Sequence, residues 1–106
     1  MRILLDSNLP SAFAALLPGH RTDTTHGRRW SDLDDGPLLD AAGPEYDAFI
    51  TMDQNLRFQQ NLRGRRLRIV IVRARGNTLP ILAPLAPDVL GALSEMGEGD
   101  LRVVGA

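Results

Sequence analysis

The chain contains three short segments that are apolar nearly throughout, within residues 2–6, 48–52 and 67–72. A strand with apolar residues at successive positions is buried on both faces, as in a parallel sheet covered by helices on either side. Two weaker segments, residues 21–25 and 101–104, have β-branched or apolar content between turn residues. The pattern therefore predicts a mainly parallel sheet of four to five strands.

Helical patterns alternate with these strands. Residues 9–17 carry apolar side chains at helical spacing and end at a Pro-Gly pair. Further helices are predicted at residues 34–43, 54–62 and 80–96, the last one broken near Pro84 or Pro87. Alternating strands and helices predict an α/β fold with three α/β/α layers, formed by residues 1–106 as a single domain.

Composition narrows the functional classes. The 106 residues are enough for one hydrophobic core, and the absence of cysteine excludes disulfides, thiolate metal sites and a cysteine nucleophile. No apolar run approaches the length of a membrane span, and the start of the chain is too short and too charged for a signal peptide. We therefore expect a soluble cytoplasmic protein.

The positive charge is concentrated in one segment. All twelve basic residues are arginine, and residues 57–75 hold seven of them with no acid, although the formal net charge of the chain is −1. Such a segment can bind RNA phosphates, meet an acidic partner protein, or form a solvated surface in an arginine-rich composition. The candidates for RNA binding are Arg57, Arg63, Arg65 and Arg66.

Two of the apolar segments end in aspartate, at Asp6 and Asp53. The carboxyl ends of parallel strands meet at one edge of a sheet, where open α/β folds place their sites. Two nearby carboxylates repel unless a cation lies between them, and oxygen ligands favour Mg²⁺ or Mn²⁺. The alternative is that each aspartate only caps the helix that follows it.

The order of short motifs is similar to that of a known family. Asp6-Ser7-Asn8 after the first strand and Thr51-Met52-Asp53 after a later one resemble motifs of PIN-domain nucleases. The resemblance is closest to small PIN-like proteins of the "domain of unknown function" type, and it covers nearly the whole chain. The segments that carry it are Leu4–Pro10, Leu38–Ala42, Thr51–Asn55 and Gln59–Leu62.

This resemblance implies a metal-dependent ribonuclease, commonly the toxin of a toxin–antitoxin pair. Asp6, Asp35 and Asp53 match the acids that hold Mg²⁺ or Mn²⁺, with Asp40 as the alternative helix acid. Relatives usually have Glu on the helix and a fourth acid after the late-strand Asp, where this chain has Gln54 and Asn55. The expected partners are RNA and a small antitoxin protein, and a homodimer is possible.

Several residues allow a second interpretation. Asn8 and Asn55 can orient the carboxylates or a water, or they can simply form turns. Trp30 can stack on a base, although a lone tryptophan more often anchors a loop to the core. The whole chain can be a catalytically weak PIN-like binding module that contacts RNA or a protein partner. A phospho-receiver domain is excluded because it needs a lysine, and a haloacid-dehalogenase-type phosphatase because position 8 is Asn.

Overall fold

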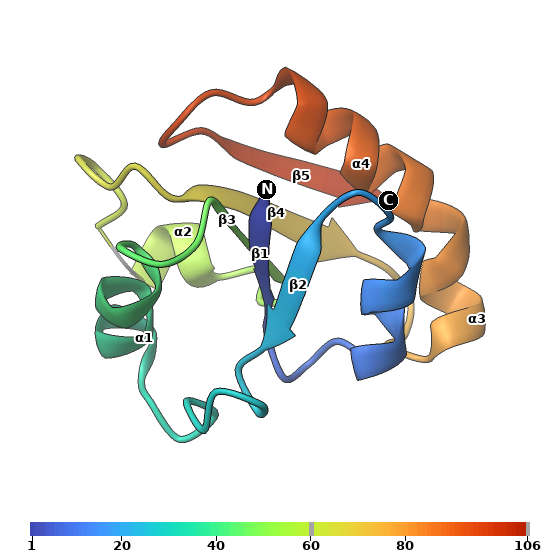
Figure 1. Cartoon of the computed structure of the whole chain (residues 1–106), viewed down its shortest axis with the longest axis horizontal. Helices are drawn as coiled ribbons and strands as arrows, with labels where there is room; N and C mark the ends of the chain where they lie inside the picture. The colour runs from blue at the N-terminus through green and yellow to red at the C-terminus, as the bar shows by residue number, and fades with distance from the viewer. Residues whose placement is uncertain (60, 106) are drawn as a thin grey trace.

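Five strands form a single sheet in the order β2-β1-β3-β4-β5, and every neighbouring pair is parallel (Figure 1). The structure is a computed structural model that describes residues 1–59 and 61–105. The strands are β1 (Arg2–Leu5), β2 (Arg21–Thr24), β3 (Ala48–Thr51), β4 (Arg68–Arg73) and β5 (Leu101–Gly105). The predicted parallel α/β sheet is therefore confirmed, and both weaker segments belong to it.

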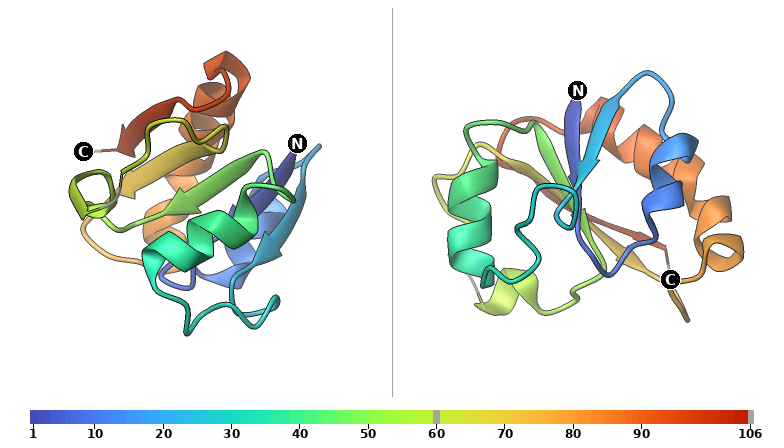
Figure 2. Two further views of the ribbon diagram at one scale, coloured as in Figure 1. Left: turned by 90° about the vertical axis from the view of Figure 1, so that its left-hand side faces the viewer. Right: turned by 60° about the horizontal axis from the view of Figure 1, so that its bottom comes forward.

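Helices cover both faces of the sheet and complete three layers (Figure 2). On one face lie α1 (Asp35–Ala42) and α2 (Leu56–Gln59). On the other lie the 3-10 helix η1 (Ser11–Leu16), α3 (Leu79–Leu82), the 3-10 helix η2 (Ala83–Leu85) and α4 (Ala86–Glu95). In the part of the chain that the structure describes, no helix has the length and apolar character to cross a membrane.

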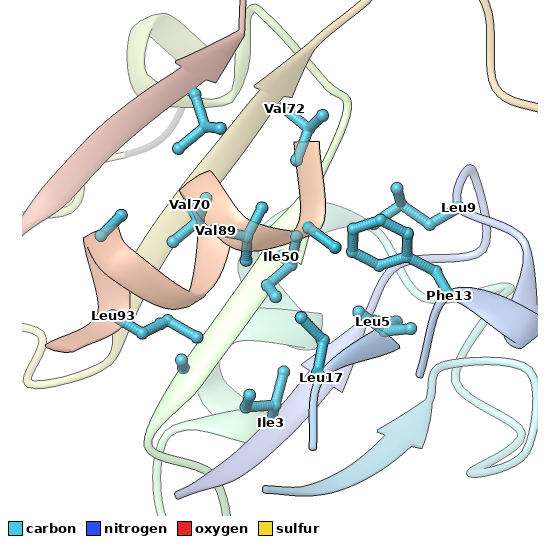
Figure 3. Close-up of a cluster of buried hydrophobic side chains, with 14 of the residues drawn as sticks. Ile3, Leu5, Leu9, Phe13, Leu17, Ile50, Val70, Val72, Val89 and Leu93 are labelled. Atoms are coloured by element: carbon cyan, nitrogen blue, oxygen red, sulfur yellow. The ribbon is translucent and has the colours of Figure 1, made fainter. Parts of the chain in front are cut away.

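Alternation along the strands divides the core between the two faces. Ile3 and Leu5 of β1 and Ile50 of β3 point toward η1 and α4, where they meet Leu17 and Val89 (Figure 3). The intervening residues point to the opposite face and pack against α1 and α2. They are Leu4, Phe49, Ile69 and Ile71, with Leu39 and Leu56 from the helices. Because both faces are buried, successive residues of the central strands must be apolar.

Three of the predicted helices differ from the observed ones in type, length or continuity. Residues 11–16 form a 3-10 helix rather than an α-helix, with Leu17 N–H bonding Ala14 O. The predicted helix at 54–62 is reduced to Leu56–Gln59; residue 60, which it includes, lies outside the described residues. The predicted helix at 80–96 is divided into three pieces because Pro84 and Pro87 lack the N–H that would continue it.

Candidate active site

Asp6 and Asp53 follow neighbouring strands at the same edge of the sheet. In the register of β1 and β3, Leu5 lies opposite Ile50, and the Asp6 N–H continues this ladder by donating to Ile50 O at 2.9 Å. Asp53 comes two residues after the end of β3. All strands run in the same direction, so both aspartates lie at the carboxyl edge.

The carboxylate of Asp6 is held by three donors. Its Oδ2 accepts hydrogen bonds from Thr51 Oγ1 at 2.7 Å and from Asn8 Nδ2 at 3.4 Å. Its Oδ1 accepts a bond from the Ser7 N–H at 2.8 Å. Side-chain and backbone donors thus fix the orientation of this half-buried carboxylate.

Thr51 connects the two strand ends through one buried hydroxyl. While donating to Asp6, Thr51 Oγ1 accepts bonds from Asn8 Nδ2 at 3.2 Å and from the Asp53 N–H at 3.0 Å. One donated and two accepted bonds use the full capacity of a hydroxyl group. In addition, Asn8 Oδ1 accepts a hydrogen bond from the Met52 N–H at 3.2 Å. The Thr51 side chain is fully buried, so its network is part of the fold as well as of the site.

The turn after β3 positions Asp53. Its Oδ1 accepts a bond from the Asn55 N–H at 3.0 Å, and the Asn55 carbonyl accepts bonds from Phe58 and Gln59 at the start of α2. Gln54 closes the turn by donating from Nε2 to Met52 O at 2.9 Å and to Val72 O at 2.8 Å. Asn55 therefore acts through its backbone in this turn, whereas Asn8 contacts a carboxylate with its side chain.

Asp35 lies in the first turn of α1 and is electrostatically coupled to the other two aspartates. Partial burial raises the pKa of its carboxyl group, and the negative charges of Asp53, Asp6 and Asp34 raise this pKa further. Among residues 1–59 and 61–105, no arginine forms an ion pair with Asp6, Asp35 or Asp53. The three carboxylates therefore bring negative charge together without an arginine paired to any of them among the described residues.

Asp40 lies elsewhere. It is on the exposed side of α1, and its Oδ1 accepts a bond from Arg65 Nη1 at 2.8 Å. Of the two helix acids considered from the sequence, Asp35 is the one whose charge interacts with Asp6 and Asp53.

The donor chemistry suits a hard divalent cation, because carboxylate oxygens are the preferred ligands of Mg²⁺ and Mn²⁺. The aspartates, however, do not surround a single point. Within the described ranges, no three His, Cys, Asp or Glu side chains form a group that is ready to hold a metal ion. The carboxyl edge thus offers oxygen ligands of a suitable kind, but they do not form a complete coordination site.

The four arginines predicted to bind RNA are not brought together. Arg57, on α2, is exposed near the carboxyl edge, and Arg63 is exposed in the following loop. Arg65 and Arg66 precede β4 and therefore lie toward the opposite edge of the sheet. There Arg65 pairs with Asp40, and Arg66 donates to Gly43 O at 3.0 Å.

Two features near the carboxyl edge were not among the individual residues predicted from the sequence. Phe58 on α2 is 74% exposed, and the Arg57 guanidinium lies 4.9 Å from the centre of its ring. Arg73 ends β4, and Arg75 follows it, so these two arginines are exposed on the carboxylate side. Their position at a strand end, the same signal that identified Asp6 and Asp53, could have revealed the arginines. No pattern in the sequence indicated the exposure of Phe58.

Comparison with known proteins adds no relative to this description. No family model matches the chain, and no significant match is found among curated proteins or solved structures.

Proposed function

We propose that the chain is a PIN-like, metal-dependent ribonuclease that acts at the carboxyl edge of its sheet. One observation carries this proposal: Asp6, Asp35 and Asp53, from three separate elements, bring negative charge to one edge without an arginine paired to any of them among the described residues. Such an accumulation is costly in a protein that binds no cation. The motif resemblance supports the same assignment.

Asp6, Asp35 and Asp53 are the residues that would hold Mg²⁺ or Mn²⁺. When bound, such an ion lowers the pKa of a water and stabilises charge on a phosphate under attack. Thr51 and Ser7 hold the Asp6 carboxylate in place, and the turn at Asn55 does the same for Asp53. The raised pKa of Asp35 comes from partial burial and from repulsion by the neighbouring carboxylates, and a bound cation would relieve this repulsion.

RNA is the substrate that fits the surrounding charges. Arg57, Arg73 and Arg75 are exposed around the carboxyl edge and can bind phosphates while the acidic site faces the cleaved bond. The motif resemblance extends the proposal to a toxin that a small antitoxin protein inhibits.

Metal binding and cleavage test this function together. Mn²⁺ should raise the melting temperature of the wild type, since a ligand at a hundredfold excess over Kd stabilises the native state by about 2.7 kcal/mol. Asp53→Asn preserves the side-chain shape and removes one of the repelling charges. We expect this variant to be at least as stable as the wild type without metal, to gain little from Mn²⁺, and to lose RNA cleavage. A wild type that millimolar Mn²⁺ does not stabilise contradicts the proposal.

The open geometry favours a second candidate, a PIN-like binding module with weak or absent catalysis. Its specific support is that no ready metal-binding group is found within the described ranges. This module would bind RNA equally well with Mg²⁺ or with a chelator and would leave the RNA intact. The nuclease requires the metal for cleavage, so the two functions separate in a single assay.

A further inference from the structure

Strand β2 forms an open border of the sheet (Figure 1). It pairs with β1 on one side, from Arg21 opposite Arg2 to Thr24 opposite Leu5. On its other side, no strand within residues 1–59 and 61–105 pairs with it. Open edges offer unpaired backbone groups to a further strand, and proteins usually protect them with prolines, bulges or a covering element. The segment Arg21–Thr24 contains no proline.

The hydrogen bonds to β1 show which backbone groups of β2 face outward. Arg21 N–H bonds Met1 O at 3.0 Å, and Thr25 N–H bonds Leu5 O at 2.9 Å. In a parallel pair, alternate residues direct both backbone groups to the same neighbour, so residues 21, 23 and 25 bond β1. Thr22 and Thr24 therefore face the open side. The Thr24 carbonyl is already used by the Arg28 N–H, which leaves both groups of Thr22 and the Thr24 N–H for a partner.

The side chains beside Thr22 have opposite charges. Arg21 and Asp23 are two residues apart, so both project from the same face of the sheet. Arg21 is exposed and forms no ion pair within the described part of the chain. Asp23 accepts a bond from the Tyr46 hydroxyl through Oδ2 at 2.6 Å, which uses one of its two oxygens. In addition, the Thr22 hydroxyl is buried without a hydrogen-bond partner.

We propose that β2 pairs with the β2 strand of a second copy of this chain, antiparallel, about a two-fold axis at Thr22. In this register Thr22 faces its counterpart as a hydrogen-bonded pair, which uses the two backbone groups that point outward. Arg21 then lies opposite Asp23 of the other copy, twice, and each pair joins opposite charges on one face.

The space beside β2 can admit a second strand. A groove of about 590 Å³ lies along this edge, and its lining includes Ser11 and Ala14 of η1 and Gly27. These small side chains allow the helices and loops of two copies to approach each other. Arg2 and Arg28 also line the groove, where Asp23 is the acidic residue. Arg28 is neutralised by Glu45, with which it forms a 2.9 Å ion pair.

The charged side chains of the opposite border, β5, are already engaged within the chain. Ile69 N–H bonds Asp100 O, so the even-numbered residues of β5 bond β4 and Val103 faces outward. An antiparallel copy centred on Val103 would place Arg102 opposite Val104, and one centred on Leu101 would place it opposite Asp100, whose Oδ2 already accepts the Gly97 N–H at 2.8 Å. Arg102 is already paired with Glu95 at 3.0 Å. Arg21, which forms no ion pair among the described residues, thus favours β2 over β5 as the surface for self-association.

Sedimentation equilibrium on the intact protein, from micromolar to millimolar concentration, tests this pairing. We expect the wild type to dimerise and Thr22→Pro to remain monomeric, since proline removes an outward N–H that the monomer does not use. Val103→Pro, the matched change on β5, should dimerise like the wild type. Arg21→Asp places like charges opposite each other twice, so its dimer Kd should rise about tenfold or more.

Charge exchange tests the register itself. Asp23→Arg alone should dimerise poorly, an equimolar mixture of Arg21→Asp and Asp23→Arg chains should form mixed dimers, and the double variant should dimerise again. Melting temperatures of all variants verify that they fold, because Asp23 also contacts Tyr46. A monomeric wild type, or a Thr22→Pro variant that dimerises as tightly, overturns the proposal. If only an acidic peptide or an RNA protects the Thr22 amide from hydrogen exchange, the groove belongs to that ligand and the proposal is also overturned.

Discussion

The hydroxyl of Thr51 donates a 2.7 Å hydrogen bond to Oδ2 of Asp6 and so joins the ends of two neighbouring strands. The same oxygen accepts a hydrogen bond from the Asp53 N–H, so one buried side chain contacts both strand-end aspartates. The geometry of the candidate site therefore depends on a residue that itself carries no charge.

Thr51→Val should loosen this junction. The substitution preserves the shape of the side chain but leaves buried partners without their hydrogen bonds, a loss of about 1–3 kcal/mol in the free energy of unfolding. RNA cleavage should fall with it, because Asp6 loses its shortest hydrogen bond. Urea unfolding and a cleavage assay measure the two effects.

Thr25→Val is the matched control. Thr25 is as fully buried as Thr51, but its hydroxyl has no hydrogen-bond partner in the described structure. Replacing it should leave stability unchanged or improve it, since an unpaired buried hydroxyl is unfavourable. Equal losses in both variants would show that the bonds of Thr51 contribute nothing specific.

The stability of the metal-free protein should depend on the protonation of Asp35. Because its pKa is raised in the folded state, the native protein binds this proton more tightly than the unfolded chain does. The stabilising effect of the proton is complete at acidic pH and is lost as pH rises through the folded pKa. Asp35→Asn should therefore be more stable than the wild type at neutral pH, with the difference vanishing in acid.

Urea unfolding over a pH series measures this difference. Asp40→Asn, on the same helix, is the control: it removes an exposed ion pair with Arg65 and should change stability by less than about 1 kcal/mol. If Asp35→Asn is less stable than the wild type at neutral pH, the favourable interaction of Asp35 with the N-terminal end of α1 outweighs the repulsion. The electrostatic account of the site would then be wrong.

The arginines should differ in their contribution to RNA binding. For single-stranded RNA, each phosphate contact adds about −0.7 to the slope of log affinity against log salt. Removing Arg57 or Arg63 should flatten this slope, since both side chains are exposed and form no ion pair within the described residues. Removing Arg65 or Arg66 should leave it unchanged, because these residues lie toward the other edge, where they bond Asp40 and the Gly43 carbonyl. An equal effect of all four would contradict the carboxyl edge as the binding surface.

Arg28 should determine how the loop before α1 is held. Its guanidinium lies 4.1 Å from the centre of the Trp30 ring and donates to the Tyr46 hydroxyl at 2.6 Å and to both carboxylate oxygens of Glu45. Arg28→Lys retains the charge but cannot form this planar set of bonds. We expect a lower melting temperature and red-shifted emission from Trp30, the single tryptophan. Unchanged fluorescence would show that Trp30 is held by the core alone.

The sequence predicted the sheet because burial on two faces is a local property of a strand. The apolar runs around Ile3–Leu5 and Ala48–Thr51 required a parallel sheet, and parallel strands necessarily bring Asp6 and Asp53 to one edge. The prolines at 84 and 87 likewise predicted the interruption of the last helix, since the missing N–H is a property of the residue. Trp30 packs edge-on against Tyr46, in agreement with its interpretation as an anchor.

Only the tertiary structure decided which residues meet. Asp35 and Asp40 lie on one helix, separated by roughly 140° around its axis, and the docking of α1 turned Asp35 toward the strand ends. The course of the chain into β4 took Arg65 and Arg66 away from the carboxyl edge, although they follow Arg57 closely in sequence. The spacing of apolar residues along the sequence predicts whether a side chain is buried, because burial repeats with the geometry of a single strand or helix. The identity of its neighbours depends on the order and packing of several elements, and this is why the sequence determined the sheet and its edge while the structure determined the site.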